Sequence, residues 1–206
     1  MAVTEKKRVY SEGASNLRVF KYNRVTGTYS ATPFVVEGLI NVDITISQTK
    51  DKKAADNKAN YLSRVSPATG DGTIQLMGMS TKMYEEFYAD IKDKNGVVNF
   101  GSTAEPQGLG LMYDEIESYV GADGNRKTST NRMVIYDCEF AFPTLSAQTL
   151  EEGNTDVKEY SLGVTCSSIE NNGRQAIAAI INSVDNPTEF AQTNTEMYIL
   201  PQDTDL

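Results

Sequence analysis

The stretch 34-FVVEGLINVDITISQTKDKKAADN-57 decides how the rest of the chain is interpreted. From residue 40 to residue 47, apolar and polar side chains alternate strictly. The apolar phase consists of Ile40, Val42, Ile44 and Ile46, and the polar phase consists of Asn41, Asp43, Thr45 and Ser47. Successive side chains of a strand point to opposite faces, so this pattern predicts a strand with one apolar and one hydrogen-bonding face.

The alternation stops at residue 48, where a charged segment begins. Residues 48–58 have no apolar periodicity, and lysines alternate there with aspartates. Such a mixture is typical of a solvated segment, so we expect a long loop over residues 48–60 that joins two strands. The loop residues that enter the functional hypothesis are Lys50, Asp51, Lys52, Lys53, Asp56 and Asn57.

Length and charge limit the classes of function. A chain of 206 residues predicts one domain with a self-sufficient core. Its 28 acidic and 19 basic residues give a formal net charge of -9. A protein that binds duplex DNA normally carries a clustered basic face, and the only basic cluster here is the segment around Lys50. The composition therefore disfavours specific nucleic-acid binding.

The compartment is predicted from the start of the chain and from its cysteines. Residues 1–8 have a basic start with no apolar run behind it, and no stretch approaches the roughly 20 apolar residues of a membrane span. We therefore expect no secretory signal, no membrane anchor and assembly in a cytosol. Cys138 and Cys166 are in phase with apolar neighbours in strand-like runs, which predicts reduced core thiols.

The remaining chain predicts a mainly β fold. About nine short strands are separated by turn signals such as residues 121–125 and 171–173, and the ambiguous run 175–181 is taken as a strand. One helix is predicted at about 81–91, capped by Ser80 or Thr81. The expected architecture is a β-sandwich or barrel with one flanking helix. Its single domain, 1–206, divides into an N-terminal arm (1–16), a β core (17–182) and a C-terminal arm (183–206).

No motif predicts catalysis. Residues 47–50 match S-x-x-K, but the serine ends a strand instead of opening a helix. Residues 108–110 lack the third glycine of a dinucleotide loop, and residues 123–134 lack required calcium ligands. Glu115 and Glu117 share a strand face that is better explained as solvated. With no His and two Cys, we predict no catalytic residue, no metal site and no cofactor.

The order of elements resembles that of the major tail proteins, or tail tube proteins, of long non-contractile-tailed bacteriophages (siphophages). The resemblance covers roughly residues 30–170. It rests on the alternating strand 38–45 running into a loop with Ala-Asp-Asn at 55–57, and on the single helix between strand 74–79 and Lys-Asn-Gly-Val at 94–97. It also rests on the late strand 136–143 and on the acidic link to Tyr-Ser-Leu at 160–162.

The resemblance implies a structural protein of the virion, assembled in the host cytoplasm. Its copies would form hexameric rings that stack into a tube, and DNA would pass through without specific binding. Tape measure, distal tail and terminator proteins would be further partners. On this hypothesis the loop at Lys50 makes the contact between rings, and the polar phase from Asn41 to Ser47 faces the lumen.

Two alternatives stay open. One is a secretion-type tube protein, which differs from the first hypothesis only in cargo. The other is a β-sandwich binding module of a surface structure, which recognises a receptor or a carbohydrate. A binding module needs an exposed aromatic platform, and most of the eleven tyrosines are in phase with strand cores.

Overall fold

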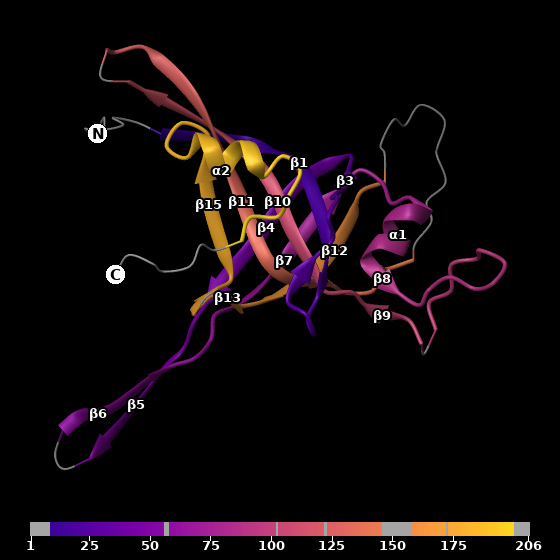
Figure 1. The fold of residues 1–206 in the computed structure, drawn as a ribbon, viewed down its shortest axis with the longest axis horizontal. Helices are drawn as coiled ribbons and strands as arrows, with labels where there is room; N and C mark the ends of the chain where they lie inside the picture. The colour runs from indigo at the N-terminus through magenta and orange to yellow at the C-terminus, as the bar shows by residue number, and fades with distance from the viewer. Residues whose placement is uncertain are drawn as a thin grey trace.

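The computed structural model describes residues 9–55, 58–101, 103–121, 123–145, 158–171 and 173–199. It confirms the mainly β prediction, with one nine-stranded antiparallel sheet and two short helices (Figure 1). The sheet contains β1 (Val9–Asn23), β2 (Thr28–Tyr29), β3 (Phe34–Val36), β4 (Leu39–Ser47), β7 (Thr69–Leu76), β10 (Leu109–Val120), β11 (Arg126–Phe140), β12 (Tyr160–Ser167) and β15 (Ala178–Asn182). The strand order is β2-β1-β10-β11-β12-β7-β4, while β3 also pairs with β1 and β15 also pairs with β11.

The described residues also form three two-stranded ribbons and two helices. The ribbons are β5 (Lys50–Ala55) with β6 (Lys58–Val65), β8 (Tyr88–Ala89) with β9 (Glu105–Pro106), and β13 (Ile169–Asn171) with β14 (Arg174–Ala176). The helices are α1 (Thr81–Phe87) and α2 (Pro187–Gln192).

The stretch that begins at Phe34 joins the two ends of the sheet. β3 pairs with β1 at one end, and β4 pairs with β7 at the other. Only Glu37 and Gly38 separate β3 from β4, so the sheet must curl until its ends meet. Gly38 has a φ of 79°, a left-handed conformation that favours glycine, and its carbonyl accepts a hydrogen bond from the Met77 N–H at 2.8 Å.

The alternation within β4 is largely as predicted. Val42 and Ile44 pack against the core, and the polar phase is exposed. A register shift between Leu39 and Asn41 turns Leu39 inward, which leaves Ile40 38% exposed. Ile46, near the open end of the strand, is 47% exposed. Two of the four predicted inward residues therefore lie at the margin of the core.

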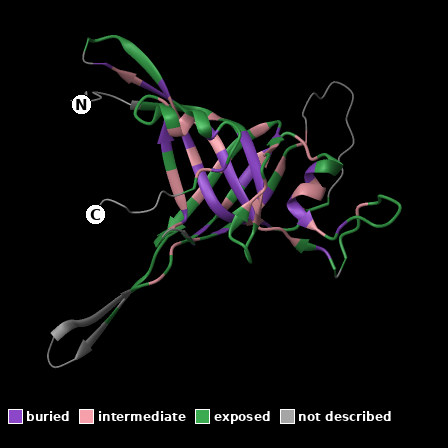
Figure 2. Ribbon diagram, in the orientation of Figure 1, coloured by how far each residue is buried: buried purple, intermediate pink, exposed green. Residues whose placement is uncertain are grey.

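The main core lies inside the curled sheet, where Figure 2 shows buried strands. α1 contributes Met83 and Phe87 to it, and the Ser80 hydroxyl caps the helix by accepting from the Met83 N–H at 3.2 Å. The helix ends at Phe87 and not at the predicted residue 91, because Tyr88 turns into extended backbone and pairs with Pro106. Ile91 is still buried in the core.

A second apolar cluster covers the outer face of β1, β10 and β11. Phe20, Met112, Val134 and Tyr136 form it together with Met197, and Phe190 of α2 packs against it. Within the segment predicted as a C-terminal arm, the described residues include α2, a helix that the sequence did not predict, and Phe190, Met197 and Tyr198 belong to or pack against this cluster. Residues 197–199 form no strand.

Two further predictions are corrected. The segment taken as a loose arm up to residue 16 is part of β1 from Val9 onward, because residues 9–15 pair with β10. The segment taken as a long loop is the β5–β6 hairpin, in which Lys50 faces Val65 across the ladder. Asp56 and Asn57 lie outside the described residues. The run 175–181 forms β14 and β15, broken at Ile177, so the choice of strand is confirmed.

Candidate assembly site

A continuous polar face covers β4, β7 and β12. Directly opposite residues of antiparallel strands present their side chains on one face, so the registers define four rows across the three strands. The rows are Asn41–Gln75–Ser161, Asp43–Thr73–Gly163, Thr45–Asp71–Thr165 and Ser47–Thr69–Ser167. We call these twelve residues the polar face. The four residues predicted from β4 are brought together there and are all exposed.

The charge of the polar face is negative. Its charged members are Asp43 and Asp71, and none of its twelve residues, all of which are described, is a lysine or an arginine. Two rows continue onto β11, where Glu139 pairs with Thr165 and Asp137 pairs with Ser167. The surface therefore presents hydroxyl, amide and carboxylate groups, and its carboxylates repel phosphate.

One arginine lies at the border of the polar face. Arg24 binds Asp137 through Nη2 at 2.8 Å and also binds Glu139. These hydrogen bonds to carboxylates raise the pKa of Arg24, mainly through Asp137. Its charge is therefore neutralised locally, and the acidic character of β4, β7 and β12 is left unbalanced.

The β5–β6 hairpin projects from the end of β4 at Ser47 (Figure 1, lower left). A network of hydrogen bonds holds its base. The Ser66 N–H donates to the Thr49 carbonyl at 2.9 Å, the Thr49 N–H donates to the Ser66 hydroxyl at 3.1 Å, and the Gln48 amide donates to the Ser66 carbonyl at 3.0 Å. The sequence beyond this base is basic, and the described side chains of Lys50 and Lys52 are exposed. The hairpin thus presents cations away from the body.

Four strands of the sheet keep an unpaired edge, and two of them, β2 and β3, each form a ladder with β1 alone among the described residues. Within the described part of the chain, β4 forms a ladder with β7 alone, and β15 forms one with β11 alone. The second edge of β4 borders the polar face over its whole length. Unpaired N–H and C=O groups along such an edge are a template for pairing with another chain.

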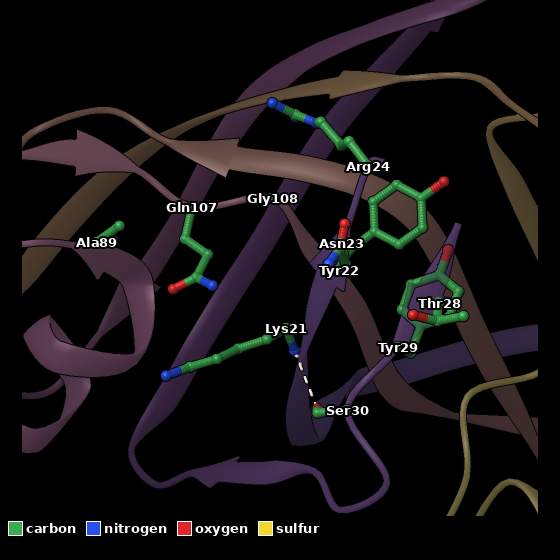
Figure 3. Close-up of a pocket in the computed structure, with 10 residues that line it drawn as sticks. All are labelled: Lys21, Tyr22, Asn23, Arg24, Thr28, Tyr29, Ser30, Ala89, Gln107 and Gly108. Atoms are coloured by element: carbon green, nitrogen blue, oxygen red, sulfur yellow. Dashed lines mark hydrogen bonds between the residues drawn. The ribbon is translucent and has the colours of Figure 1, made fainter. Parts of the chain in front are cut away.

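An open groove of about 500 Å³ lies beside the β1–β2 turn (Figure 3). Tyr22 and Tyr29 in it stack on each other at 4.7 Å between ring centroids, and the Lys21 N–H donates to the Ser30 hydroxyl at 3.1 Å. Burial raises the pKa of both tyrosines. The ten described residues that line the groove include no carboxylate, cysteine or histidine.

Sequence reasoning missed the contributions of β7 and β12 to the polar face. Their alternation was readable, with Thr69, Asp71 and Thr73 on one strand and Thr165 and Ser167 on the other. The alternation within each strand does not reveal the register between strands. That register aligns β4, β7 and β12, although residues of one row lie up to 120 positions apart in the sequence.

The described residues contain no group of three or more His, Cys, Asp or Glu side chains placed to hold a metal ion. None of the described helices has the length and apolar character to cross a membrane.

No family model matches the chain, and no curated protein matches it. One similar solved structure is a chain in the cryo-EM structure of the anti-feeding prophage baseplate, determined with six-fold symmetrisation. The two chains are 9% identical, the similarity covers 81% of this chain and 93% of that chain, and the TM-score is 0.33. A match of this extent carries no argument about fold or function, so the proposal below rests on the residues of this chain.

Proposed function

We propose that this chain is a structural protein of a siphophage tail. Copies of it assemble into hexameric rings, and the rings stack into the tube through which DNA leaves the virion. Assembly takes place in the host cytoplasm with tape measure, distal tail and terminator proteins as further partners. The observation that carries the proposal is the polar face of β4, β7 and β12, which is acidic and without a cation.

The polar face has the chemistry that a DNA conduit requires. Duplex DNA carries about one negative charge per 1.7 Å of its axis, and each lysine or arginine that contacts it contributes to binding. A lumen wall lined with cations would hold the DNA in place. Asp43 and Asp71 instead repel phosphate, while hydroxyl groups such as Thr45 keep the wall hydrated. DNA therefore passes without specific binding.

The unpaired edge of β4 suits closure into a ring. An exposed edge must be paired or protected, and cyclic symmetry pairs every edge with a neighbouring copy and leaves none open. Because this edge borders the polar face, pairing along it extends the same polar wall from one protomer to the next.

The β5–β6 hairpin suits contact between rings. It reaches away from the body and carries a cluster of lysines, whereas the protein as a whole has a net charge of -9. A basic projection set against an acidic neighbour gives electrostatic complementarity and fixes orientation. Lys50, Asp51, Lys52 and Lys53 lie on β5 and keep their proposed role between rings, although the segment is a ribbon and not a loop. Asp56 and Asn57, which have the same proposed role, lie outside the described residues.

Electron microscopy of the purified protein tests the proposal. We expect rings or hollow tubes at high protein concentration, with an oligomer in sedimentation velocity whose size increases with concentration. The same measurements are repeated with the other tail proteins added, where we also expect assembly. A protein that stays monomeric in every salt and at every concentration, with and without those partners, would overturn the proposal.

The two alternatives differ from it in specific ways. A secretion-type tube shares the assembly but carries protein cargo, so encapsidated DNA separates the two. A binding module needs aromatic rings that are free to receive a ligand, but Tyr22 and Tyr29 in the groove stack on each other. We do not advance the binding module as a second proposal.

A further inference from the structure

We propose that Cys138 and Cys166 are a disulfide-forming pair that locks β11 to β12 when the protein meets an oxidant. The two residues are register partners in the antiparallel β11–β12 ladder. Their Sγ atoms lie 2.9 Å apart inside the main core, and the residues are 0% and 3% exposed. This inference stands on the fold and does not depend on the proposed tube.

The backbone already has the geometry that a disulfide needs. Directly opposite residues of an antiparallel pair have Cα atoms about 4.5–5.5 Å apart, which is within the range of about 4.4–6.8 Å that a disulfide bridges. Both side chains point to the core side of the ladder, as their membership of the main core cluster shows. Bond formation therefore requires a small approach of the two sulfur atoms and no movement of a strand.

The disulfide would stabilise the sheet because the two cysteines lie on a short ladder that joins its two parts. β11 changes its neighbour along its length, pairing with β15 over Asn131–Ile135 and with β12 only over Asp137–Phe140. This short ladder of four register pairs connects β1, β10 and β11 to β12, β7 and β4. By contrast, β12 pairs with β7 along all eight of its residues. A covalent bond between Cys138 and Cys166 thus crosses the shortest ladder on the path from β1 to β4.

The chemistry is a thiol–disulfide exchange with a small external disulfide such as oxidised glutathione. One cysteine thiolate attacks that disulfide and releases one glutathione thiol, and the second cysteine then displaces the other. Two S–H bonds of the protein are lost, one S–S bond forms between Cys138 and Cys166, and two electrons and two protons pass to the glutathione. Burial raises the pKa of Cys138, so the exchange in the folded protein is slow and proceeds when the ladder opens. The thiols thus stay reduced in a reducing cytosol.

Refolding the full chain in glutathione redox buffers tests the pair. The reduced protein is refolded from urea in a series of ratios of reduced to oxidised glutathione, and a parallel set is kept in concentrated urea. Free thiols are then alkylated, and the intact mass distinguishes dithiol, intramolecular disulfide and glutathione adducts. The effective concentration of the pair is the squared concentration of reduced glutathione divided by the concentration of oxidised glutathione, taken where half of the protein is oxidised. We expect this value to be at least about tenfold higher in the folded protein than in urea.

Two controls make the result decisive. The single variants Cys138→Ser and Cys166→Ser report glutathione adducts alone, because neither can form the intramolecular bond. The oxidised protein is expected to unfold at a higher urea concentration than the reduced protein, and dithiothreitol is expected to reverse the difference. Equal effective concentrations in the folded and unfolded chains, or folded protein that yields only glutathione adducts or stays reduced, would overturn the proposal.

Discussion

Arg132 and Asp114 form a buried, bidentate ion pair, with Nε–Oδ1 at 2.7 Å and Nη2–Oδ2 at 3.0 Å. Arg18 approaches the same carboxylate at 3.4 Å, so one aspartate serves two guanidinium groups. The arginines also hold the C-terminal segment, because Arg18 donates to the Thr193 carbonyl at 2.7 Å and Arg132 donates to the Phe190 carbonyl at 2.9 Å. The Phe190 ring lies 4.1 Å from the Arg132 guanidinium carbon. This cluster docks α2 on the sheet.

Replacing Asp114 by Ala is therefore expected to cost about 3–5 kcal/mol of unfolding free energy, because it leaves two buried guanidinium groups without their anion. Burial and the charge of Arg132 already lower the pKa of Arg18, which Asp114 opposes. Urea unfolding measures the cost, and hydrogen exchange at residues 190–194 reports release of the segment. The control is Glu85→Ala, which breaks an exposed ion pair with Lys92 at 2.9 Å and should cost less than about 1 kcal/mol. Similar losses in the two variants would contradict the docking role.

The Tyr136 hydroxyl is buried and has no hydrogen-bond partner among the described residues. An unpaired buried hydroxyl costs free energy, so Tyr136→Phe is expected to leave stability unchanged or raise it by up to about 1–2 kcal/mol. The matched variant is Tyr88→Phe, which removes a hydrogen bond of 2.7 Å to the Ala141 carbonyl and should cost about 1 kcal/mol. Thermal and urea unfolding of the two variants measure the contrast, and a loss of stability in Tyr136→Phe would count against it.

Titration of the Tyr136 hydroxyl should make the free energy of unfolding depend on pH in the alkaline range. Burial, followed by the neighbouring Tyr198, raises the pKa of Tyr136 above its unfolded value of about 10. The folded state then binds more protons than the unfolded state above about pH 10, so the stability that is fully present below this pH falls as the pH rises. Tyr136→Phe should make this fall shallower in urea titrations at several alkaline pH values. An identical slope in the wild type and the variant would contradict the raised pKa.

Gly72 allows β4 to lie against β7. A Cβ atom at this position would overlap the Asp43 carbonyl oxygen and lie 2.7 Å from the Ile44 Cα. Gly72→Ala is therefore expected to push the strands apart and to cost at least about 1–3 kcal/mol, as overpacking does. The control is Gly78→Ala, where nothing lies within 4 Å of the added atom and stability should change little. Equal unfolding midpoints for the two variants would show that β4 shifts without strain.

Local patterns predicted those parts of the fold that local chemistry decides. The strict alternation over residues 40–47 predicted β4, Ser80 predicted the start of α1, and the Gly-Ala-Asp-Gly-Asn sequence at 121–125 predicted the turn between β10 and β11. In each case a short segment contains both the residues and the reason for their conformation. The polar phase of β4 was identified as an exposed surface for the same reason.

Features that depend on distant partners escaped prediction. β5 consists of lysine, aspartate and alanine, which have low strand propensity, and it is a strand only because it forms a ladder with β6. Residues 9–15 contain Gly13 with φ of 70°, yet β10 holds them in β1. The Asp114 cluster joins residues 18, 114 and 132, and no spacing in the sequence indicates that one carboxylate will meet two arginines.

On the proposed function, the lysines of the β5–β6 hairpin hold stacked rings together. Replacing Lys50, Lys52 and Lys53 by Glu reverses the charge of the projection and is expected to shorten or abolish tubes while circular dichroism and the unfolding midpoint stay unchanged. The matched control replaces the same lysines by Arg, which keeps the charge and should keep the tubes. Because exposed charges are screened beyond about 8–10 Å at physiological salt, added salt should also weaken stacking of the wild type. Tubes of normal length in the Glu variant would remove the hairpin from the contact.

The polar face predicts how the tube treats DNA. Replacing Asp43 and Asp71 by Lys places cations in adjacent rows of the face, and each phosphate contact adds to a salt-dependent affinity. Tubes of this variant assembled with short duplex DNA are expected to retain it in a form protected from nuclease, and to release it as the salt concentration rises. Replacement of the same residues by Asn removes the negative charge without adding a cation, so these tubes should retain no DNA. Protection from nuclease is the deciding readout, because DNA bound to the outer surface is digested. If the Lys variant binds DNA only in a nuclease-sensitive form, or not at all, the face formed by β4, β7 and β12 does not line the lumen.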